Sequence, residues 1–157
     1  MMFRPMRRFG QQLPPEECEA ILQSEKRGVL AVLGDDGYPY TVPLDFLYAD
    51  GKIYFHGAHE GHKIDALARC DKASFCVTDG GEAREGDWAL WFRSVVAFGR
   101  VRMLTDREET IALARALALK YYPTPDGVEE EIEKAGSRVR VLEMTVEHLT
   151  GKRVHEK

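Results

Sequence analysis

The sequence predicts a mostly β, α+β domain: a small antiparallel barrel of about six strands with helices at its periphery. Short apolar and β-branched segments are separated by turn signals rich in glycine and aspartate, which is typical of antiparallel hairpins. Other segments repeat apolar residues at helical spacing. The chain has 157 residues, which suits one hydrophobic core, so we expect a single domain over residues 1–157.

The first expected elements are a helix and a hairpin. Pro14 and Pro15 precede two glutamates, as at a first helical turn, which predicts a helix that ends near Lys26. An apolar run at residues 29–33 is followed by a Gly-Asp-Asp-Gly turn signal at residues 34–37. The turn leads directly into another extended segment, so a β-hairpin is predicted.

Residues 40–48 alternate strictly, as in a strand with one face on the core. Pro43 lacks the N–H for a ladder hydrogen bond, so we expect this strand at a sheet edge or distorted at that point. The turn Asp50-Gly51 then begins a third strand at residues 52–56. These three strands are expected to form a meander.

The middle of the chain predicts one helix and two strands. The helix runs from about residue 60 to about residue 70, and a strand follows at residues 73–78. A polar loop at residues 79–86 leads to a long apolar run at residues 91–104. Gly99 interrupts this run, which predicts a long strand with a bulge or a close backbone approach.

The last third of the chain predicts two helices and a closing strand. A T-x-x-E capping box at residues 105–108 begins a helix that Pro123 and Pro125 end. A shorter acidic helix is expected at residues 128–134, and the last strand at residues 139–149.

Composition and charge limit the partners. The formal net charge of -4 provides no overall attraction to nucleic acid, and no apolar run reaches the length of about 20 residues that a membrane span needs. The basic arm at residues 1–12 is expected to be a solvated terminus. Three cysteines without C-x-x-C spacing indicate a reducing compartment. We therefore expect a cytoplasmic protein that binds neither nucleic acid nor membrane.

Several catalytic motifs do not occur in the sequence. It contains no Walker A motif, no G-x-G-x-x-G after a strand and no G-x-S-x-G elbow, which argues against P-loop, Rossmann and hydrolase functions. Cys70 and Cys76 have no evident base partner and are interpreted as core residues. Trp88, Trp91 and Phe92 either pack within the protein or stack on a planar ring.

The clearest candidate site lies at residues 55–63. Its three histidines lack the spacing of known metal motifs, so no metal site is expected. Small residues lead into a helix start, where free N–H groups and the helix dipole favour an anion. Gly61 permits close approach and Lys63 adds a positive charge, so the segment predicts a phosphate site.

Five short motifs occur in a fixed order along the chain. They are Gly37-Tyr38-Pro39-Tyr40, Val42-Pro43-Leu44-Asp45-Phe46, Tyr54-Phe55-His56-Gly57-Ala58, Gly61-His62-Lys63 and Arg93-Ser94-Val95-Val96-Ala97-Phe98-Gly99. Their order and spacing resemble the pyridoxamine 5'-phosphate oxidase-like flavoprotein superfamily and, within it, the branch that contains the nitroimidazole-resistance (Nim) proteins. The resemblance extends over about residues 13–152 and implies a six-stranded split β-barrel. It also implies a homodimer with one FMN at each of two sites across the subunit interface.

The resemblance assigns FMN contacts to a strand along the isoalloxazine ring, to a segment on the ribityl and phosphate side, and to phosphate-binding residues. In that order, these residues are Thr41, Val42, Pro43 and Leu44; His56, Gly57 and Ala58; and Gly61, Lys63 and Ser94, with Val95 beside Ser94. His56 also falls where Nim proteins have a histidine at their active site, which makes it the expected catalytic residue. Residues 150–152 resemble the closing motif of the family and would approach the partner's flavin.

The expected function is that of an FMN-dependent oxidoreductase with a small, nitroaromatic substrate. The sequence lacks an evident arginine-rich motif for pyridoxal phosphate, which argues against pyridoxamine phosphate oxidation itself. An alternative is a flavin or haem protein for binding or storage without turnover, because four histidines are candidate haem ligands. They are His56, His59, His62 and His148. Use of F420 in place of FMN and a vestigial pocket are further alternatives.

Overall fold

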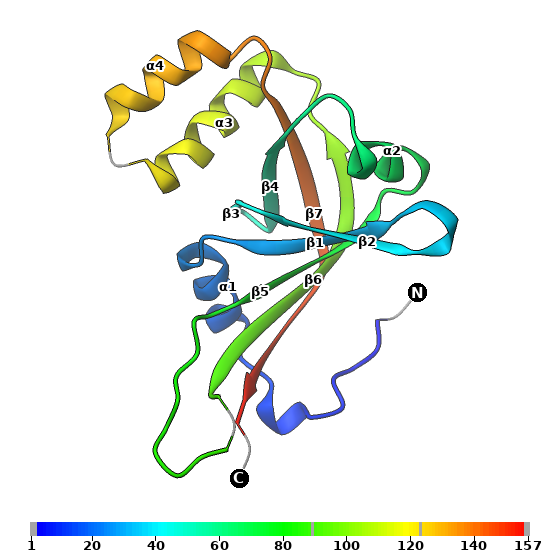
Figure 1. The fold of residues 1–157 in the computed structure, drawn as a ribbon, viewed down its shortest axis with the longest axis vertical. Coiled ribbons are helices and arrows are strands. Elements are labelled where there is room, and N and C mark those ends of the chain that lie inside the picture. Colours follow the sequence, from blue (N-terminus) through cyan, green and yellow to red (C-terminus); the bar gives the residue numbers. More distant parts are fainter. Residues whose placement is uncertain (1–2, 89, 123, 156–157) are drawn as a thin grey trace.

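The computed structural model describes residues 3–88, 90–122 and 124–155. In these residues, seven strands form one antiparallel sheet (Figure 1), which confirms the mostly β, α+β class. The strands are β1 (Gly28–Leu33), β2 (Pro39–Leu44), β3 (Leu47–Ala49), β4 (Lys52–Gly57), β5 (Lys72–Thr78), β6 (Phe92–Met103) and β7 (Arg140–Val154).

Four α-helices surround the sheet within the described residues. They are α1 (Pro15–Ser24), α2 (His62–Arg69), α3 (Arg107–Tyr121) and α4 (Pro125–Ala135). All four occur close to where the sequence predicts a helix. The cap of α3 is one residue later than the expected capping box, since the Asp106 side chain accepts a hydrogen bond from the Glu109 N–H at 2.8 Å. The predicted helix end at Pro123 lies outside the described residues.

The strand order is β2-β1-β5-β6-β7-β4-β3, so β2 and β3 are the edges and the sheet is not closed. Pro43 lies in the edge strand β2, as predicted. The predicted meander is wrong. β1 pairs with β2 and β5, whereas β3 and β4 lie at the opposite end of the sheet, where β4 pairs with β7.

There are seven strands instead of the expected six because the segment 40–48 divides into β2 and β3. Phe46 lies between them with a fully buried side chain. Its N–H donates to the Tyr121 hydroxyl at 2.8 Å, and its carbonyl accepts from the Lys120 ammonium at 2.9 Å. Side chains of α3 therefore bond the backbone groups of Phe46 that a neighbouring strand would otherwise bond. The alternation of apolar residues at 40–48 does not show this interruption of the strand.

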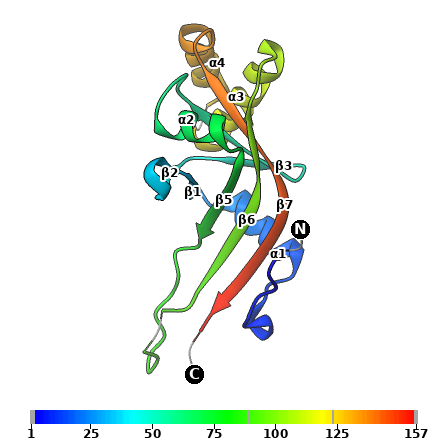
Figure 2. The same ribbon diagram turned by 90° about the vertical axis from the view of Figure 1, so that its right-hand side faces the viewer.

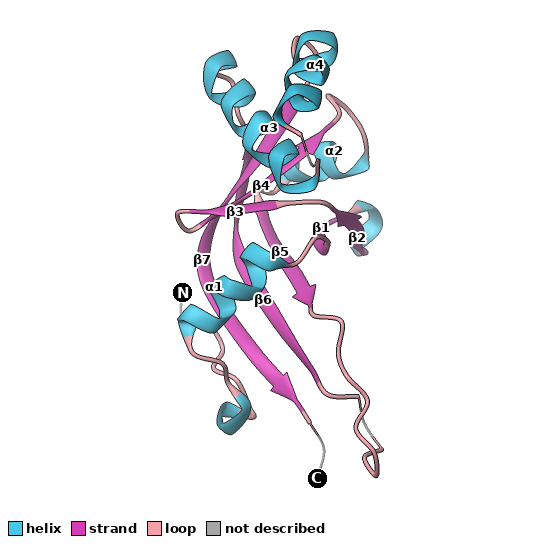
Figure 3. Cartoon of the chain, turned by 90° about the vertical axis from the view of Figure 1, so that its left-hand side faces the viewer, coloured by secondary structure: helices cyan, strands magenta, loops and turns pink. Residues whose placement is uncertain are grey.

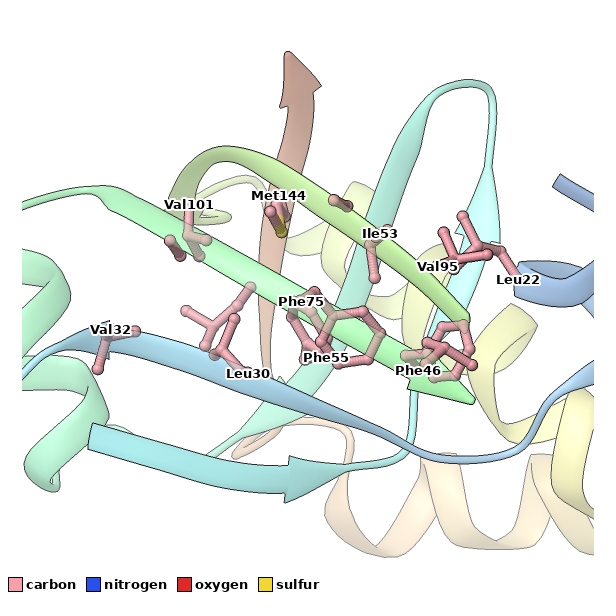
Figure 4. Close-up of a cluster of buried hydrophobic side chains, with 14 of the residues drawn as sticks. Leu22, Leu30, Val32, Phe46, Ile53, Phe55, Phe75, Val95, Val101 and Met144 are labelled. Carbon is pink, nitrogen blue, oxygen red and sulfur yellow. The ribbon is translucent and has the colours of Figure 1, made fainter. Parts of the chain in front are cut away.

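The sheet coils around one hydrophobic core. Phe75 of β5 contacts Phe46 and Phe55 edge to face, with ring centroids 5.0 Å apart in each pair. Figure 4 shows these rings between side chains of β1, β4, β6 and β7. Side chains from both ends of the sheet contribute to this core, so the sheet is coiled although it is not closed.

The long strands β6 and β7 extend from the helices α3 and α4 to the far end of the molecule (Figure 2). Their register shifts between Phe98 and Gly99, and the extra residue is Glu147 of β7, so the predicted bulge does not lie in β6. Gly99 instead makes the close backbone approach given as the alternative, because an added Cβ atom would lie against the Thr145 carbonyl. α1 covers the inner face of the lower part of the sheet (Figure 3), where Cys18, Ile21 and Leu22 are buried. In the described part of the chain, no helix is both long and apolar enough to cross a membrane.

Candidate functional site

The end of β4, the edge strand β2 and the start of α2 meet at one place. Pro43 and Leu44 of β2, His56 of β4 and the pair Arg27 and Asp45 line a cavity of about 330 Å³. The Arg27 guanidinium lies 3.0 Å from the Asp45 carboxylate and so neutralises the one acid in this lining. Sequence analysis did not identify this ion pair, because the two residues are 18 positions apart in the sequence and only the β1–β2 hairpin brings them together.

The start of α2 presents unused backbone donors. Its first intrahelical hydrogen bond runs from the Asp65 N–H to the Gly61 carbonyl, so the N–H groups of His62, Lys63 and Ile64 precede it. No side chain caps this helix start. Gly61 has φ +134° and ψ 174°, a conformation that costs other residues roughly 1–3 kcal/mol. Glycine is therefore required for the chain to enter the helix here.

The lysine of α2 lies over the end of β4. A Cβ atom placed on Gly57 would lie 3.6 Å from Cε and 3.9 Å from Nζ of Lys63. The positive charge is thus close to both the glycine of β4 and the free N–H groups of the helix. These are the residues at which the sequence predicts an anion site.

His62 connects the start of α2 to β2. Its ring stacks on Tyr40 with a centroid distance of 4.0 Å, and its Nε2 atom lies 3.8 Å from the Asp35 carboxylate. Asp35 also accepts a hydrogen bond from Arg69 at 2.7 Å. His62 is therefore engaged with the β1–β2 turn, while His56 is exposed at the cavity.

These contacts bring most of the predicted site residues together. We refer to residues 41–44, residues 56–58, Gly61 and Lys63 as the edge cluster. Within β2, Val42 and Leu44 pack against the core, whereas Thr41 and Pro43 are exposed on the outer face of the sheet. The edge cluster thus combines a strand at the sheet edge, an exposed histidine and the uncapped N–H groups of a helix start.

The remaining predicted residues lie elsewhere in the chain. Ser94 pairs with Thr78 of β5 and with Lys152 of β7, and Val95 pairs with Gly151. We refer to Ser94, Val95 and residues 150–152 as the ladder cluster. It lies toward the end of the sheet near the C-terminus, away from α2 (Figures 1 and 2). Within one chain, the structure therefore does not bring Ser94 to Lys63.

The side chains of the ladder cluster have different environments. Val95 is fully buried in the core, and its main chain lies between β5 and β7, so neither is open to a ligand. Gly151 faces α1, where an added Cβ atom would lie 2.4 Å from the Cys18 Sγ atom. The glycine of the closing motif is therefore required by helix packing. Burial raises the pKa of the Cys18 and Cys76 thiols. The prediction that Cys70 and Cys76 are core residues is wrong, because both are only partly buried, whereas Cys18 is buried.

The outer face of the sheet is continuous and largely uncharged in its central rows. Residues directly opposite each other in antiparallel strands lie on the same face of the sheet. Two rows of such residues cross the five strands β2, β1, β5, β6 and β7. The first row is Pro43, Val29, Cys76, Val96 and Thr150, and the second row is Thr41, Ala31, Ser74, Phe98 and His148. Val29 is 40% exposed and Phe98 is 38% exposed on this face. Thr41, Pro43 and Ser94 all lie on it.

Part of this outer face contacts the N-terminal arm. The Phe3 ring stacks on His148 with a centroid distance of 4.7 Å and lies 5.5 Å from the Phe98 ring. Arg4, Arg7 and Arg8 are exposed. The described residues of the arm therefore lie against the sheet through an aromatic contact that sequence analysis did not identify.

An ion-pair network holds the lower ends of the strands. Arg93 of β6 bonds Asp79 and Glu17 at 2.9 Å each, and Arg153 of β7 bonds Glu17 at 3.0 Å. Hydrogen bonds from Arg93 and Arg153 keep the pKa of the Glu17 carboxyl below its usual value. Arg93, which precedes Ser94, is thus engaged in joining α1 to the sheet.

Comparison with known proteins identifies the family. The sequence matches the family described as pyridoxamine 5'-phosphate oxidase over residues 14–153. The chain belongs to this family. None of the curated proteins matches the sequence.

Solved structures show the same fold for this family member. It is similar to a proposed 5-nitroimidazole antibiotic resistance protein from Bacteroides thetaiotaomicron, with 21% identity, a TM-score of 0.76, and coverage of 90% of this chain and 86% of that one. A flavocytochrome from Azotobacter vinelandii has 19% identity and a TM-score of 0.78, with 97% and 73% covered. An FAD and haem binding protein from Mycobacterium smegmatis has 20% identity and a TM-score of 0.73, with 94% and 74% covered.

Proposed function

We propose that this protein binds FMN and is an oxidoreductase that acts on small aromatic compounds, nitroaromatic compounds among them. The observation that carries the proposal is the edge cluster. In a chain of this family, it combines free helix N–H groups, the Lys63 ammonium and an open strand edge beside His56.

The phosphate side of the edge cluster fits FMN in its donor chemistry. Three N–H groups at the start of α2 and the Lys63 ammonium are the donors that a phosphate monoester accepts from. Gly57 and Gly61 place no side chain here. The space beside Gly61 is open, because an added Cβ atom would contact nothing within 4 Å. Because the donors suit a single phosphate, we propose FMN as the flavin.

The other side of the edge cluster fits a flat ring. β2 is an edge strand, so the main-chain groups on its outer side have no strand partner and are free to bond the polar atoms of a ring. A bound flavin supplies the electron transfer. His56 would hold or donate a proton where substrate meets the ring, and Pro43 and Leu44 would exclude water.

We further propose that the protein acts as a homodimer. The ladder cluster carries Ser94 and Lys152 but lies away from the edge cluster in one chain. The outer face, with its exposed Val29 and Phe98, offers an apolar surface for a second copy. In such a dimer, the ladder cluster of one protomer would complete the edge cluster of its partner.

The absorbance spectrum of the purified protein, before and after addition of FMN, tests the proposal. We expect flavin bands that remain with the protein through gel filtration, and tighter binding of FMN than of FAD or F420 in parallel titrations. A protein without flavin absorbance that binds none of the three would overturn the proposal. Reduction of nitrobenzene by the loaded protein then tests the activity.

The alternative of haem binding has one supporting observation. His62 stacks on Tyr40 and His148 stacks on Phe3, whereas His56 is exposed beside a cavity and is open to a ligand. A Soret band after addition of haemin that is lost in His56→Ala would favour haem. An unchanged band in this variant would place haem elsewhere.

A further inference from the structure

A second cavity, of about 410 Å³, lies between α3 and α4 above the end of β4. Figures 1 and 3 show the two helices side by side at this end of the molecule. Most of its wall is apolar. The apolar lining consists of Ala114, Leu117, Ala118, Val128, Ile132, Ala135 and Val139.

Small residues create the space in this cavity. Ala114 and Ala118 lie one turn apart on α3, and Ala135, the last residue of α4, also lines the cavity. In the sequence, these alanines look like ordinary helix-core positions. Only the distance between the two helices shows that their short side chains leave room. A cavity of this size with mostly apolar walls and a few polar groups is typical of a small-molecule site.

The polar groups around this cavity do not favour a charged ligand. Asp45 is paired with Arg27, and the Tyr121 hydroxyl already bonds the Lys26 and Phe46 carbonyls at 2.7 and 2.9 Å. The other charged lining residues are Glu131 and Arg138, which have opposite signs. An anion would gain no net positive charge here and would lose its hydration, so the cavity selects a neutral compound.

The cavity adjoins the edge cluster at His56. Asp45 and His56 line both this cavity and the smaller one beside Pro43 and Leu44. His56 therefore lies where a compound in the α3–α4 cavity meets the proposed position of the flavin ring. A compound held by the apolar wall would have its exposed edge at His56.

We propose that the α3–α4 cavity binds the substrate, a neutral and mostly apolar compound, and that Ala118 limits its size. That this ligand is the substrate rests on the proposed flavin function. That the cavity binds the ligand does not depend on that function. Ala118 acts by leaving space, and it makes no polar contact with the ligand.

Equilibrium dialysis of nitrobenzene and benzoate against the flavin-free protein tests the proposal. The two compounds have nearly the same shape, but only benzoate is charged at neutral pH. We expect nitrobenzene to bind and benzoate not to bind. Equal binding of the two compounds, or no binding of nitrobenzene, would overturn the proposal.

Variants on α3 test the position of the ligand. Ala118→Phe fills the cavity, and we expect it to weaken nitrobenzene binding by about tenfold or more. Ala116→Phe is the matched control, because Ala116 is exposed on the same helix and is not in the lining. Ala118→Leu adds less volume, and we expect it to have an intermediate effect if the phenylalanine variant does not fold. Full nitrobenzene affinity in a folded Ala118 variant contradicts the proposal.

FMN titrations of the same variants separate this proposal from the proposed function. We expect Ala118→Phe and Ala116→Phe to bind FMN as the unmodified protein does. If nitrobenzene binds and flavin does not, the cavity stands and the flavin function fails. If flavin binds and nitrobenzene does not, the flavin function stands and the assignment of this cavity fails.

Discussion

The edge cluster and the ladder cluster differ in how their backbone groups are used. At the start of α2, three N–H groups have no helical partner and the neighbouring strand β2 is a sheet edge. Ser94 instead lies on a central strand, with β5 on one side and β7 on the other. The first region is thus free to bind through its main chain. The second offers only side chains, from an outer face that is itself exposed.

This difference is the reason for the proposed dimer. The edge cluster has backbone donors and Lys63, and the ladder cluster has the Ser94 hydroxyl and the Lys152 ammonium. The sheet keeps the two clusters apart within one chain, so we propose that a second copy combines them. The following experiments test this division.

The largest effect is expected for Lys63→Met in the edge cluster. The loss of one charge-assisted hydrogen bond should cost about 1.5–3 kcal/mol, which is roughly a 10- to 150-fold weaker affinity for FMN. Fluorescence titration of FMN measures this change. Lys134→Met, at an exposed position of α4, is the control and should leave the affinity unchanged. An unchanged affinity in Lys63→Met would remove the edge cluster from the phosphate site.

A mixed dimer tests whether the two clusters meet across subunits. One chain carries Lys63→Met and the other carries Ser94→Ala with Lys152→Met, so neither homodimer has an intact site. After random mixing, about a quarter of the sites should regain full affinity, because half of the dimers are mixed and each has one intact site. Stoichiometric FMN titration measures this fraction. No recovery would mean that both clusters of a site belong to one chain.

Neighbouring residues of β6 should respond differently to truncation. Val95→Ala removes buried methyl groups from the core and should lower the free energy of unfolding by about 2 kcal/mol. Ser94→Ala, on the outer face, should change it by less than about 0.5 kcal/mol while weakening FMN binding. Urea unfolding of both variants measures the difference. Equal destabilisation would show that Ser94 has a packing role.

The last prediction concerns pH and Lys120, which supports Phe46 behind the edge cluster. Burial, together with the nearby Lys26, lowers the pKa of its ammonium from 10.5 to about 8. The unfolded chain retains this proton up to higher pH, so raising the pH from about 8 to about 10.5 should stabilise the native state. The unfolding free energy relative to Lys120→Met should rise over this interval. If the difference in unfolding free energy does not change with pH, the Lys120 amine is not desolvated. For the exposed control Lys134→Met, we expect a difference that does not change with pH.

Much of the fold could be predicted because its signals are local. The turn at Asp50 and Gly51 and the alternation in the strands each depend on neighbouring residues. The place of Gly61 and Lys63 at a helix start was also predictable, since the two residues are only two positions apart in the sequence. The pairing of β1 with β5 was not, because it depends on a residue far along the chain.

The sequence by itself determined where most of the helices and strands form. It also determined that the strand with Pro43 lies at a sheet edge and that Gly61 and Lys63 lie at a helix start. Tertiary structure alone decided that Tyr121 and Lys120 divide one predicted strand in two. It also decided that Ser94 lies apart from Lys63. The physical reason is that backbone conformation and periodicity are local, whereas strand order, sheet coiling and the space between packed helices depend on contacts between distant residues.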